Sequence, residues 1–464
     1  MSDDECHYLP LTELAELFRR KTLSPVEITS AMLDRIARHD RTLSSYITVL
    51  PERAMDKARQ AEAEIARGVW RGPLHGVPLA IKDLCDTSFA PSTAGMKVRA
   101  NYVPKRSATV IERLEDGGAV ILGKLAMTEG AFFEHHPEMP TPINPWSPAH
   151  WPGVSSSGSG VATAAGLCYA SLGSDTGGSI RFPSAYCGLT GVKPTWGRVS
   201  RAGVFALAAS LDHVGTMARN AADAAAVLAR IAGRDPCDST SLDAPVPDYL
   251  GRIGEGIGGV RLGVDEISIA EDTDVAVLAA VQEAIDILLL CGACRREVVM
   301  PSSRATVDSW MSLMAMEAAA AHRDTFPSRA DDYGVRLRTL LEQSRQIGNE
   351  TIVETTRARD VYTGKLNELF RNVDLLILPV AGDVAPRVDA LAQWANADPY
   401  RIGRFTAPFN CSGHPTITLQ GGVDRAGVPI GVQLVARHLG EDLLLRAAHA
   451  FQQRTDWHAR HPAL

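Results

Sequence analysis

Residues 153–170 read GVSSSGSGVATAAGLCYA, in which three consecutive serines and a Gly-Ser-Gly sequence precede an apolar run. Small residues in this pattern can form a flexible linker, a cradle for a phosphate group or part of a reaction centre. Linkers are long and polar, whereas this stretch is short and lies between apolar segments. The pattern therefore argues against a linker. The choice between a phosphate cradle and part of a reaction centre depends on the rest of the sequence.

Short apolar runs alternate with helical patterns on both sides of this stretch, which indicates an α/β fold with a largely buried sheet. Near the start, Ser24 is expected to cap a helix whose first residue is Pro25. The segment 235–259 is expected to be a long surface connection. The main expected elements are strands at 77–81, 119–125, 260–265, 373–380, 416–422 and 430–437, and helices at 107–118, about 273–290 and 441–453.

One large domain is the preferred interpretation, because no long linker rich in Pro, Ser or Gly divides the 464 residues and no internal repeat is found. Within it, residues 1–70 are expected to form an N-terminal helical segment packed on the core. Residues 71–464 are expected to form the α/β domain itself.

Composition argues against several classes of protein. The formal net charge of −7 gives no basic surface for nucleic acid, and no run reaches the roughly 18 apolar residues of a membrane span. An N-terminus without an apolar signal segment and only eight cysteines favour the cytoplasm. Cys291 and Cys294 form a CxxC, which is better explained as two thiols at a helix end than as a metal site, because no further ligands stand close in sequence.

A second segment rich in small residues, GSDTGGSIRFPSAYCG, covers residues 173–188. Gly177 and Gly178 let backbone N–H groups approach a ligand, and Ser179 leads an expected helical turn. Clustered N–H groups there could hold a phosphate or a developing oxyanion. A phosphate-binding loop would need a lysine after the last glycine, and neither segment has one, so the pattern favours acyl transfer over nucleotide binding.

Acyl transfer needs a nucleophile and a base. The Gly-x-Ser-x-Gly elbow of α/β-hydrolases is absent. His135 and His136 could line a pocket, and a Ser-His-Asp triad stays open because triads assemble in space. Lys82 ends an apolar strand, where burial would lower its pKa and allow the neutral amine to accept a proton. Taken alone, Lys82 is better explained as an ordinary lysine at a strand end.

Three segments together resemble the amidase signature family. They are GVPLAIKD (76–83), GVSSSGSGVATAAG (153–166) and GSDTGGSIRFPSAYCGLTGVKPTWGRVSRAG (173–203). Shorter segments, among them GKLAMTEGAF, INPWSP, TAPFNCSGHPTITL and GVPIGVQLVAR, extend the resemblance from about residue 8 to the end of the chain. The resemblance implies one domain with a mixed central sheet covered by helices on both faces.

The resemblance also implies a Ser–cis-Ser–Lys triad, in which Ser179 is the nucleophile, Ser155 the bridging serine and Lys82 the base. The backbone N–H groups of Thr176, Gly177, Gly178 and the nucleophile would form the oxyanion hole. Asp175 and Arg181 match positions that hold these loops, and no metal or organic cofactor is implied. The sequence has Val154 where the family usually has glycine before the bridging serine, at a peptide bond that is cis in the family.

The segment TEGAFFEHHPEMPTPINPW (128–146) is expected to form the wall of the acyl pocket, with Glu129, Gly130 and Ala131 as substrate-binding residues. Small residues at 130 and 131 would leave room for a bulky group, which Phe132 and Phe133 could line. No Arg or Lys in this segment could hold a carboxylate, so we expect hydrolysis of a neutral amide, anilide or carbamate by a monomer or homodimer. The alternative is the glutaminase component of a tRNA amidotransferase, which the same family includes.

Overall fold

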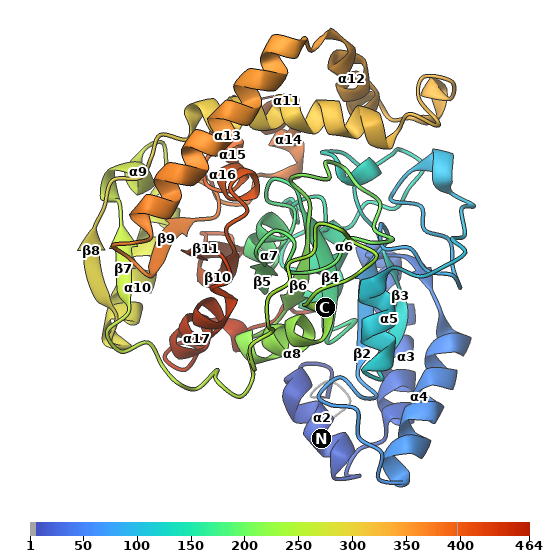
Figure 1. Ribbon diagram of the computed structural model, residues 1–464. Coiled ribbons are helices and arrows are strands. Elements are labelled where there is room, and N and C mark those ends of the chain that lie inside the picture. Colours follow the sequence, from blue (N-terminus) through green and yellow to red (C-terminus); the bar gives the residue numbers. More distant parts are fainter. Residues whose placement is uncertain (1–5, 397) are drawn as a thin grey trace.

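The computed structural model describes residues 6–396 and 398–464 and has a mixed β-sheet of eleven strands at its centre (Figure 1). β2 runs parallel to β3 and β4, and β7 runs parallel to β8 and β9, whereas the remaining neighbours are antiparallel. The strands, in their order across the sheet, are β1 (Tyr46–Val49), β3 (Val120–Leu125), β2 (Pro78–Lys82), β4 (Ala170–Asp175), β6 (His213–Ala218), β5 (Thr190–Lys193), β10 (Thr416–Val423), β11 (Pro429–Ala436), β9 (Leu375–Pro379), β7 (Arg261–Val264) and β8 (Cys294–Glu297).

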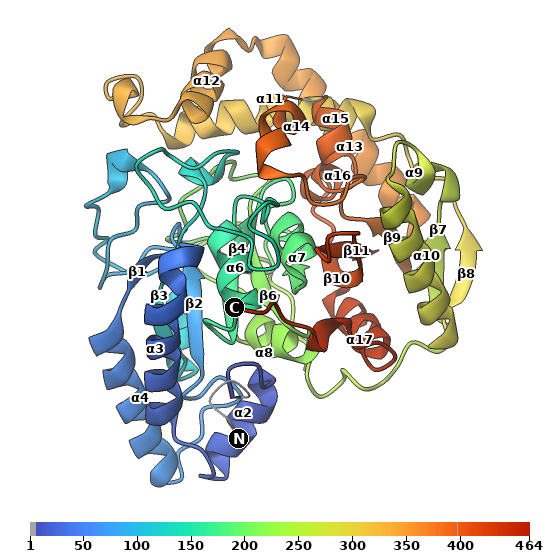
Figure 2. The ribbon, with the colours of Figure 1, turned by 180° about the vertical axis from the view of Figure 1, so that it is seen from behind.

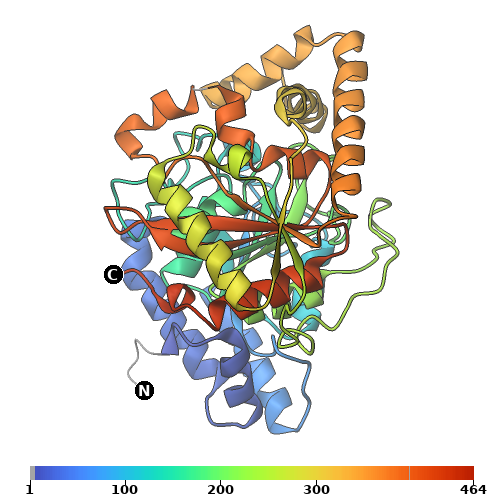
Figure 3. The same ribbon diagram turned by 90° about the vertical axis from the view of Figure 1, so that its left-hand side faces the viewer.

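Helices lie on both faces of this sheet, as the edge-on view shows (Figure 3). The described helices are α2 (Leu11–Arg19), α3 (Pro25–Leu43), α4 (Pro51–Ala66), α5 (Thr109–Asp116), α6 (Ser157–Ala164), α7 (Arg181–Cys187), α8 (Ala221–Ile231), α9 (Glu266–Ala270), α10 (Val275–Leu290), α11 (Arg304–Ala321), α12 (Val335–Gln343), α13 (Asn349–Leu369), α14 (Leu391–Ala395), α15 (Pro399–Gly403), α16 (Ala407–Cys411) and α17 (Glu441–Gln452). None of them is long and apolar enough to span a membrane.

The expected α/β fold with a mixed sheet covered on both faces is confirmed, and each strand and helix expected at the ranges given above is present. Ser24 caps α3, because its hydroxyl accepts hydrogen bonds from the backbone N–H groups of Val26 and Glu27. The segment 235–259 connects α8 to β7 without helix or strand. Cys291 ends α10 and Cys294 begins β8.

The expected N-terminal helical segment, residues 1–70, is described from residue 6 and contains one strand in addition to its helices. Besides α2, α3 and α4 it contains β1, which pairs antiparallel with β3 at the edge of the sheet. Helices α3 and α4 pack on β2 and β3 (Figure 2). A strand of four residues carries too short a pattern to stand out beside two long helices, and its pairing partner lies far along the chain.

The three serines lead into α6, which is buried along its whole length. A Cβ atom on Gly158 would collide with the backbone of Ala126 and Ser45, and one on Gly160 would press against Pro183 of α7. Glycine at these two positions therefore lets α6 pack directly on its neighbours. This close packing places the serine stretch next to the turn that follows β4.

Candidate active site

The side chain of Lys82, the last residue of β2, is completely buried and surrounded by hydroxyl groups. Its Nζ lies 2.7 Å from Ser155 Oγ, 2.9 Å from Ser156 Oγ and 2.8 Å from Ser174 Oγ. An ammonium group can donate all three hydrogen bonds. A neutral amine can instead accept one of them, because a hydroxyl also donates. The three hydroxyl groups can therefore form hydrogen bonds with Lys82 in either protonation state.

Burial lowers the pKa of Lys82 to about 7. Asp175 and Asp212 act in the opposite direction but do not compensate for the loss of water. This direction agrees with the expectation that a buried position would lower the pKa of this lysine. A substantial fraction of Lys82 is consequently neutral near physiological pH, and a neutral amine can act as a base.

Ser155 contacts Lys82, and the next residue, Ser156, contacts the turn that carries Ser179. The Val154–Ser155 peptide bond is cis, as the resemblance implies. The N–H of Ser156 donates to the carbonyl of Ser179 at 3.2 Å, and the hydroxyl of Ser156 accepts from the N–H of Ser174 at 3.2 Å. The two serine-rich segments, separate in sequence, are thus joined by hydrogen bonds in space.

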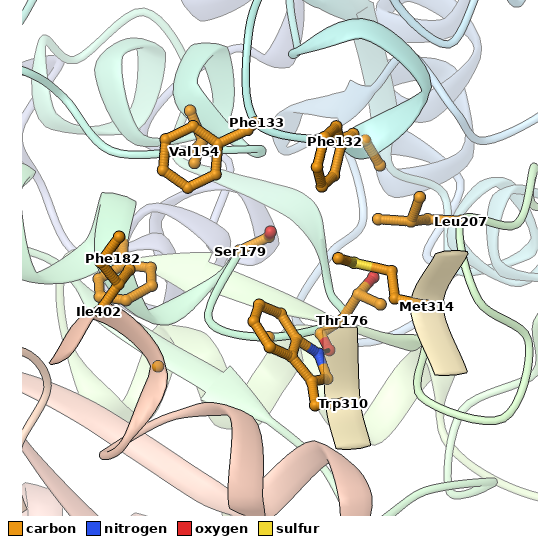
Figure 4. Close-up of a pocket in the computed structure, with 13 residues that line it drawn as sticks. Phe132, Phe133, Val154, Thr176, Ser179, Phe182, Leu207, Trp310, Met314 and Ile402 are labelled. Atoms are coloured by element: carbon orange, nitrogen blue, oxygen red, sulfur yellow. Dashed lines mark hydrogen bonds between the residues drawn. The ribbon is translucent and has the colours of Figure 1, made fainter. Parts of the chain in front are cut away.

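Ser179 differs from Lys82 and Ser155 in being accessible. It follows β4 and precedes α7, and it is partly exposed although the residues on both sides of it are buried. Its hydroxyl lies in a pocket, where Figure 4 shows it between Val154, Phe132 and Trp310. A substrate carbonyl group in this pocket could therefore reach the hydroxyl of Ser179.

Asp175, at the end of β4, holds the turn in place. Its carboxylate accepts hydrogen bonds from the N–H groups of Gly178 at 2.7 Å and Ile180 at 3.1 Å, and it pairs with Arg181 at 2.8 Å. Burial alone would raise the pKa of Asp175, but the guanidinium of Arg181 outweighs it and holds that pKa well below its usual range. The pair is completely buried, which fits the expected supporting role of both residues.

The hydrogen bonds to the carbonyl groups of this turn show in which direction its N–H groups point. Three carbonyls accept hydrogen bonds: Asp175 from Asn410 Nδ2 at 2.9 Å, Thr176 from Trp310 Nε1 at 2.9 Å, and Gly178 from the Phe182 amide at 2.7 Å. The carbonyl and N–H of a trans peptide unit point in opposite directions. The N–H groups of Thr176, Gly177 and Ser179 therefore point away from these donors.

Gly178 departs from the expected set of oxyanion donors. Its N–H is directed at the carboxylate of Asp175, as the 2.7 Å hydrogen bond shows. Its φ of +133° suits glycine, and a Cβ atom there would collide with the ring of Phe182. The geometry thus leaves Thr176, Gly177 and Ser179 as candidate donors, and Gly178 shapes the turn.

The pocket around Ser179 is apolar, and none of its thirteen lining residues is charged (Figure 4). Four are aromatic: Phe132, Phe133, Phe182 and Trp310. Four more are large and aliphatic: Val154, Leu207, Met314 and Ile402. Because burying an unpaired charge costs several kcal/mol or more, this lining is suited to an uncharged apolar group.

Of the three residues expected to bind substrate, only Ala131 lines the pocket. A Cβ atom on Gly130 would meet Leu337 of α12. The carboxylate of Glu129 accepts hydrogen bonds from the N–H of Gly334 at 2.9 and 3.1 Å, and burial raises the pKa of Glu129 to about 7. Glu129 and Gly130 therefore connect the pocket wall to the segment before α12 and lie behind the wall.

Histidine is not placed to act as the base for Ser179. His135 Nε2 lies 2.9 Å from Ser157 Oγ, and burial lowers the pKa of His135 to about 4. His136 Nδ1 accepts from the backbone N–H of Glu138. Within residues 6–396 and 398–464, no histidine makes a hydrogen bond to Ser179. The geometry favours Lys82 over the alternative Ser-His-Asp arrangement.

Three residues of the site were missed in the sequence. Ser156 and Ser174 lie inside the two segments quoted above. Their contacts with Lys82 could have been anticipated only from where β2, which ends at Lys82, lies relative to these segments. Trp310 lies in α11 without a surrounding motif, so no sequence signal connects it to the turn at Thr176.

Comparison with known proteins identifies the family. A profile described as amidase matches residues 27–445. The chain is 47% identical, over 100% of its own length and 97% of the relative's, to the Mycobacterium tuberculosis protein named "Putative amidase AmiD". It is 37% identical to the A component of the glutamyl-tRNA(Gln) amidotransferase of a Geobacter species, with 97% of this chain and 98% of that protein covered.

Among solved structures, the native peptide amidase from Stenotrophomonas maltophilia superposes with a TM-score of 0.84 and 29% sequence identity, with 97% of each chain covered. The sequence match and the shared fold extend over nearly the whole chain. The chain therefore belongs to the amidase signature family and is a hydrolase that acts on amides.

Proposed function

We propose that the chain hydrolyses the C–N bond of a neutral amide, anilide or carbamate through an acyl-enzyme on Ser179, with Ser155 as proton relay and Lys82 as base. The observation that carries the proposal is the 2.7 Å contact between Lys82 and Ser155 in a buried position that lowers the pKa of the lysine to about 7. The accessible hydroxyl of Ser179 in an apolar pocket supports it.

The reaction begins when neutral Lys82 takes the proton of Ser155 while Ser155 takes that of Ser179. Ser179 Oγ then bonds to the substrate carbonyl carbon, and the N–H groups of Thr176, Gly177 and Ser179 bind the resulting oxyanion. As the C–N bond breaks, Ser155 gives a proton to the leaving nitrogen and recovers one from Lys82. Water repeats the sequence on the acyl-enzyme and releases the acid.

The lining of the pocket supports an uncharged substrate. A carboxylate or ammonium group held near Ser179 would lose its water without gaining an ion-pair partner from any of the lining residues. Aromatic side chains on several sides, among them Phe132 and Trp310, offer stacking surfaces to an aryl or other bulky group. We infer that a neutral aromatic or branched apolar group occupies the pocket.

A panel of substrates tests this function. With an acetanilide-type anilide, an aliphatic amide, an aryl carbamate and glutamine, we expect kcat/KM for the best neutral substrate to exceed that for glutamine by about 100-fold or more, because glutamine brings two charges. Product mass spectrometry identifies the bond that is cleaved. Equal or better turnover of glutamine contradicts the proposed substrate class.

The second candidate is the glutaminase component of an amidotransferase, which the 37% identity to the Geobacter relative favours. Such a component would act in a complex, whereas we propose a monomer or homodimer. Gel filtration combined with an ammonia-release assay separates the two. Glutamine-dependent release of ammonia that rises when the other components of an amidotransferase are added supports the second candidate.

Activity should also be independent of added metal. Among the described residues, no group of three or more His, Cys, Asp or Glu side chains is arranged to hold a metal ion, and the proposed steps need none. We expect EDTA treatment followed by dialysis to leave kcat/KM unchanged within experimental error. Loss of activity that zinc restores would contradict the proposed chemistry.

A further inference from the structure

Trp310 reaches the nucleophile turn from a distant part of the chain. It lies on α11, which packs against α13, α15 and α16 on the opposite side of the molecule from α2 to α4 (Figure 1). Its indole N–H donates to the carbonyl of Thr176 at 2.9 Å. The indole ring also lies directly against Gly177, since a Cβ atom on Gly177 would collide with it.

We propose that Trp310 is a positioning residue for the oxyanion-binding backbone of this enzyme, and that its indole N–H orients and polarises the peptide unit between Thr176 and Gly177. The inference rests on the proposed function, in which Ser179 is the nucleophile. The hydrogen bond fixes the carbonyl of Thr176 on one side of the unit. The N–H of Gly177, on the opposite side, therefore points away from the indole, and in the proposed reaction it binds the oxyanion.

Two physical effects make this contact useful for catalysis. An oxyanion hole is effective because its donors are already oriented before charge develops, and the indole prevents rotation of this peptide unit. In addition, a chain of hydrogen bonds is cooperative: a donor on the carbonyl increases the partial positive charge on the N–H of the same unit. The apolar lining of the pocket strengthens both effects, because none of its thirteen residues carries a charge that would compete for the N–H.

The same side chain lines the substrate pocket (Figure 4), so its ring and its N–H have separable roles. The ring contributes to binding, which affects ground state and transition state alike. The N–H acts on the donor that the transition state uses. Removing only the N–H should therefore lower kcat and leave KM nearly unchanged.

Trp310→Phe keeps an aromatic ring and removes the N–H. We expect kcat on the best neutral amide to fall about tenfold with KM changed less than twofold, as for the loss of one hydrogen bond of ordinary strength. Inhibition by a trifluoromethyl ketone, whose adduct carries the oxyanion, should weaken by a similar factor. The rate at which a fluorophosphonate labels Ser179 should also fall, because its phosphoryl oxygen occupies the same hole.

Trp146→Phe is the matched control. Trp146 lies outside the pocket, and its indole N–H also donates to a backbone carbonyl at 2.9 Å, that of Cys187 at the end of α7. We expect this variant to keep kcat, KM and the labelling rate within twofold of the unmodified enzyme. Where Trp310→Phe does not fold, site-specific incorporation of benzothienylalanine at position 310 preserves the shape of tryptophan and removes only the N–H.

The outcomes separate this inference from the proposed function. Unchanged kcat, inhibition and labelling in the Trp310 variant, or a change in KM alone, overturns the positioning role and leaves Ser179 in place. Labelling of another residue in the unmodified enzyme overturns the proposed function and the inference with it. The labelling rate gives this information even when no tested amide is hydrolysed.

Discussion

Replacing Ser179 by alanine should reduce kcat by at least about 10⁴-fold on any substrate that the enzyme hydrolyses, because the acyl-enzyme then has no oxygen on which to form. Ser155 cannot take over. It is buried, with 1% of its surface exposed, and its hydroxyl lies 2.7 Å from Lys82. A fluorophosphonate should label one residue of the unmodified enzyme, and peptide mass spectrometry should place the label on Ser179.

Ser184→Ala provides the control. This serine lies on α7, close to Ser179 in sequence, and its hydroxyl donates to the carbonyl of Ile180 at 2.8 Å within the helix. We expect the variant to keep kcat and the labelling stoichiometry within about threefold, since alanine is well tolerated in a helix. A Ser179→Ala enzyme that retains near-normal kcat, or a label found elsewhere, contradicts the assignment of the nucleophile.

The elements of the fold were predictable where the local pattern alone decides. The continuous apolar run that forms β9, the helical stripe of α10 and the serine cap of α3 each carry their own signal. The order of the strands across the sheet has no such local signal in the sequence. β5 lies between β6 and β10 because of how the chain crosses the sheet, and hydrophobic periodicity does not record this.

The residues of the candidate site also fall into two groups, those that lie in a recognisable motif and those that only the packing of distant helices brings to the site. Lys82, Ser155 and Ser179 stand in dense motifs of small residues, and the structure brings their segments together. Trp310 and Asn410 reach the turn after β4 through the packing of α11 and α16. The resemblance alone makes Gly178 an expected oxyanion donor, but the direction of an N–H depends on the neighbouring acceptor, in this case Asp175.

Lys82 should control the acid side of the pH–rate profile. Burial lowers its pKa to about 7; below that pH the amine is protonated and cannot accept the proton of Ser155. We expect kcat/KM to rise with pH and to level off above an apparent pKa near 7. Measurement of kcat/KM from pH 5 to 9 on a neutral amide checks this, since such a substrate does not itself titrate in that range.

Substitutions of Lys82 test the same assignment. Lys82→Ala should lower kcat/KM by about 10³-fold or more, and by more than Ser155→Ala, because water can partly replace a relay hydroxyl but not the base. Lys82→Arg should be no better than alanine, since the guanidinium stays charged and cannot accept a proton. Lys124→Arg is the control. Lys124 is equally buried, but it pairs with Asp83 at 3.2 Å.

Arginine at position 124 keeps the positive charge beside Asp83, so the acid limb should stay near pH 7 even if the midpoint of thermal unfolding falls. A shift of that limb in the Lys124 variant but not in the Lys82 variants would place the titrating group elsewhere. Substantial activity of Lys82→Arg with an unchanged profile would make Lys82 a structural residue. One of the histidines would then have to be reconsidered as the base.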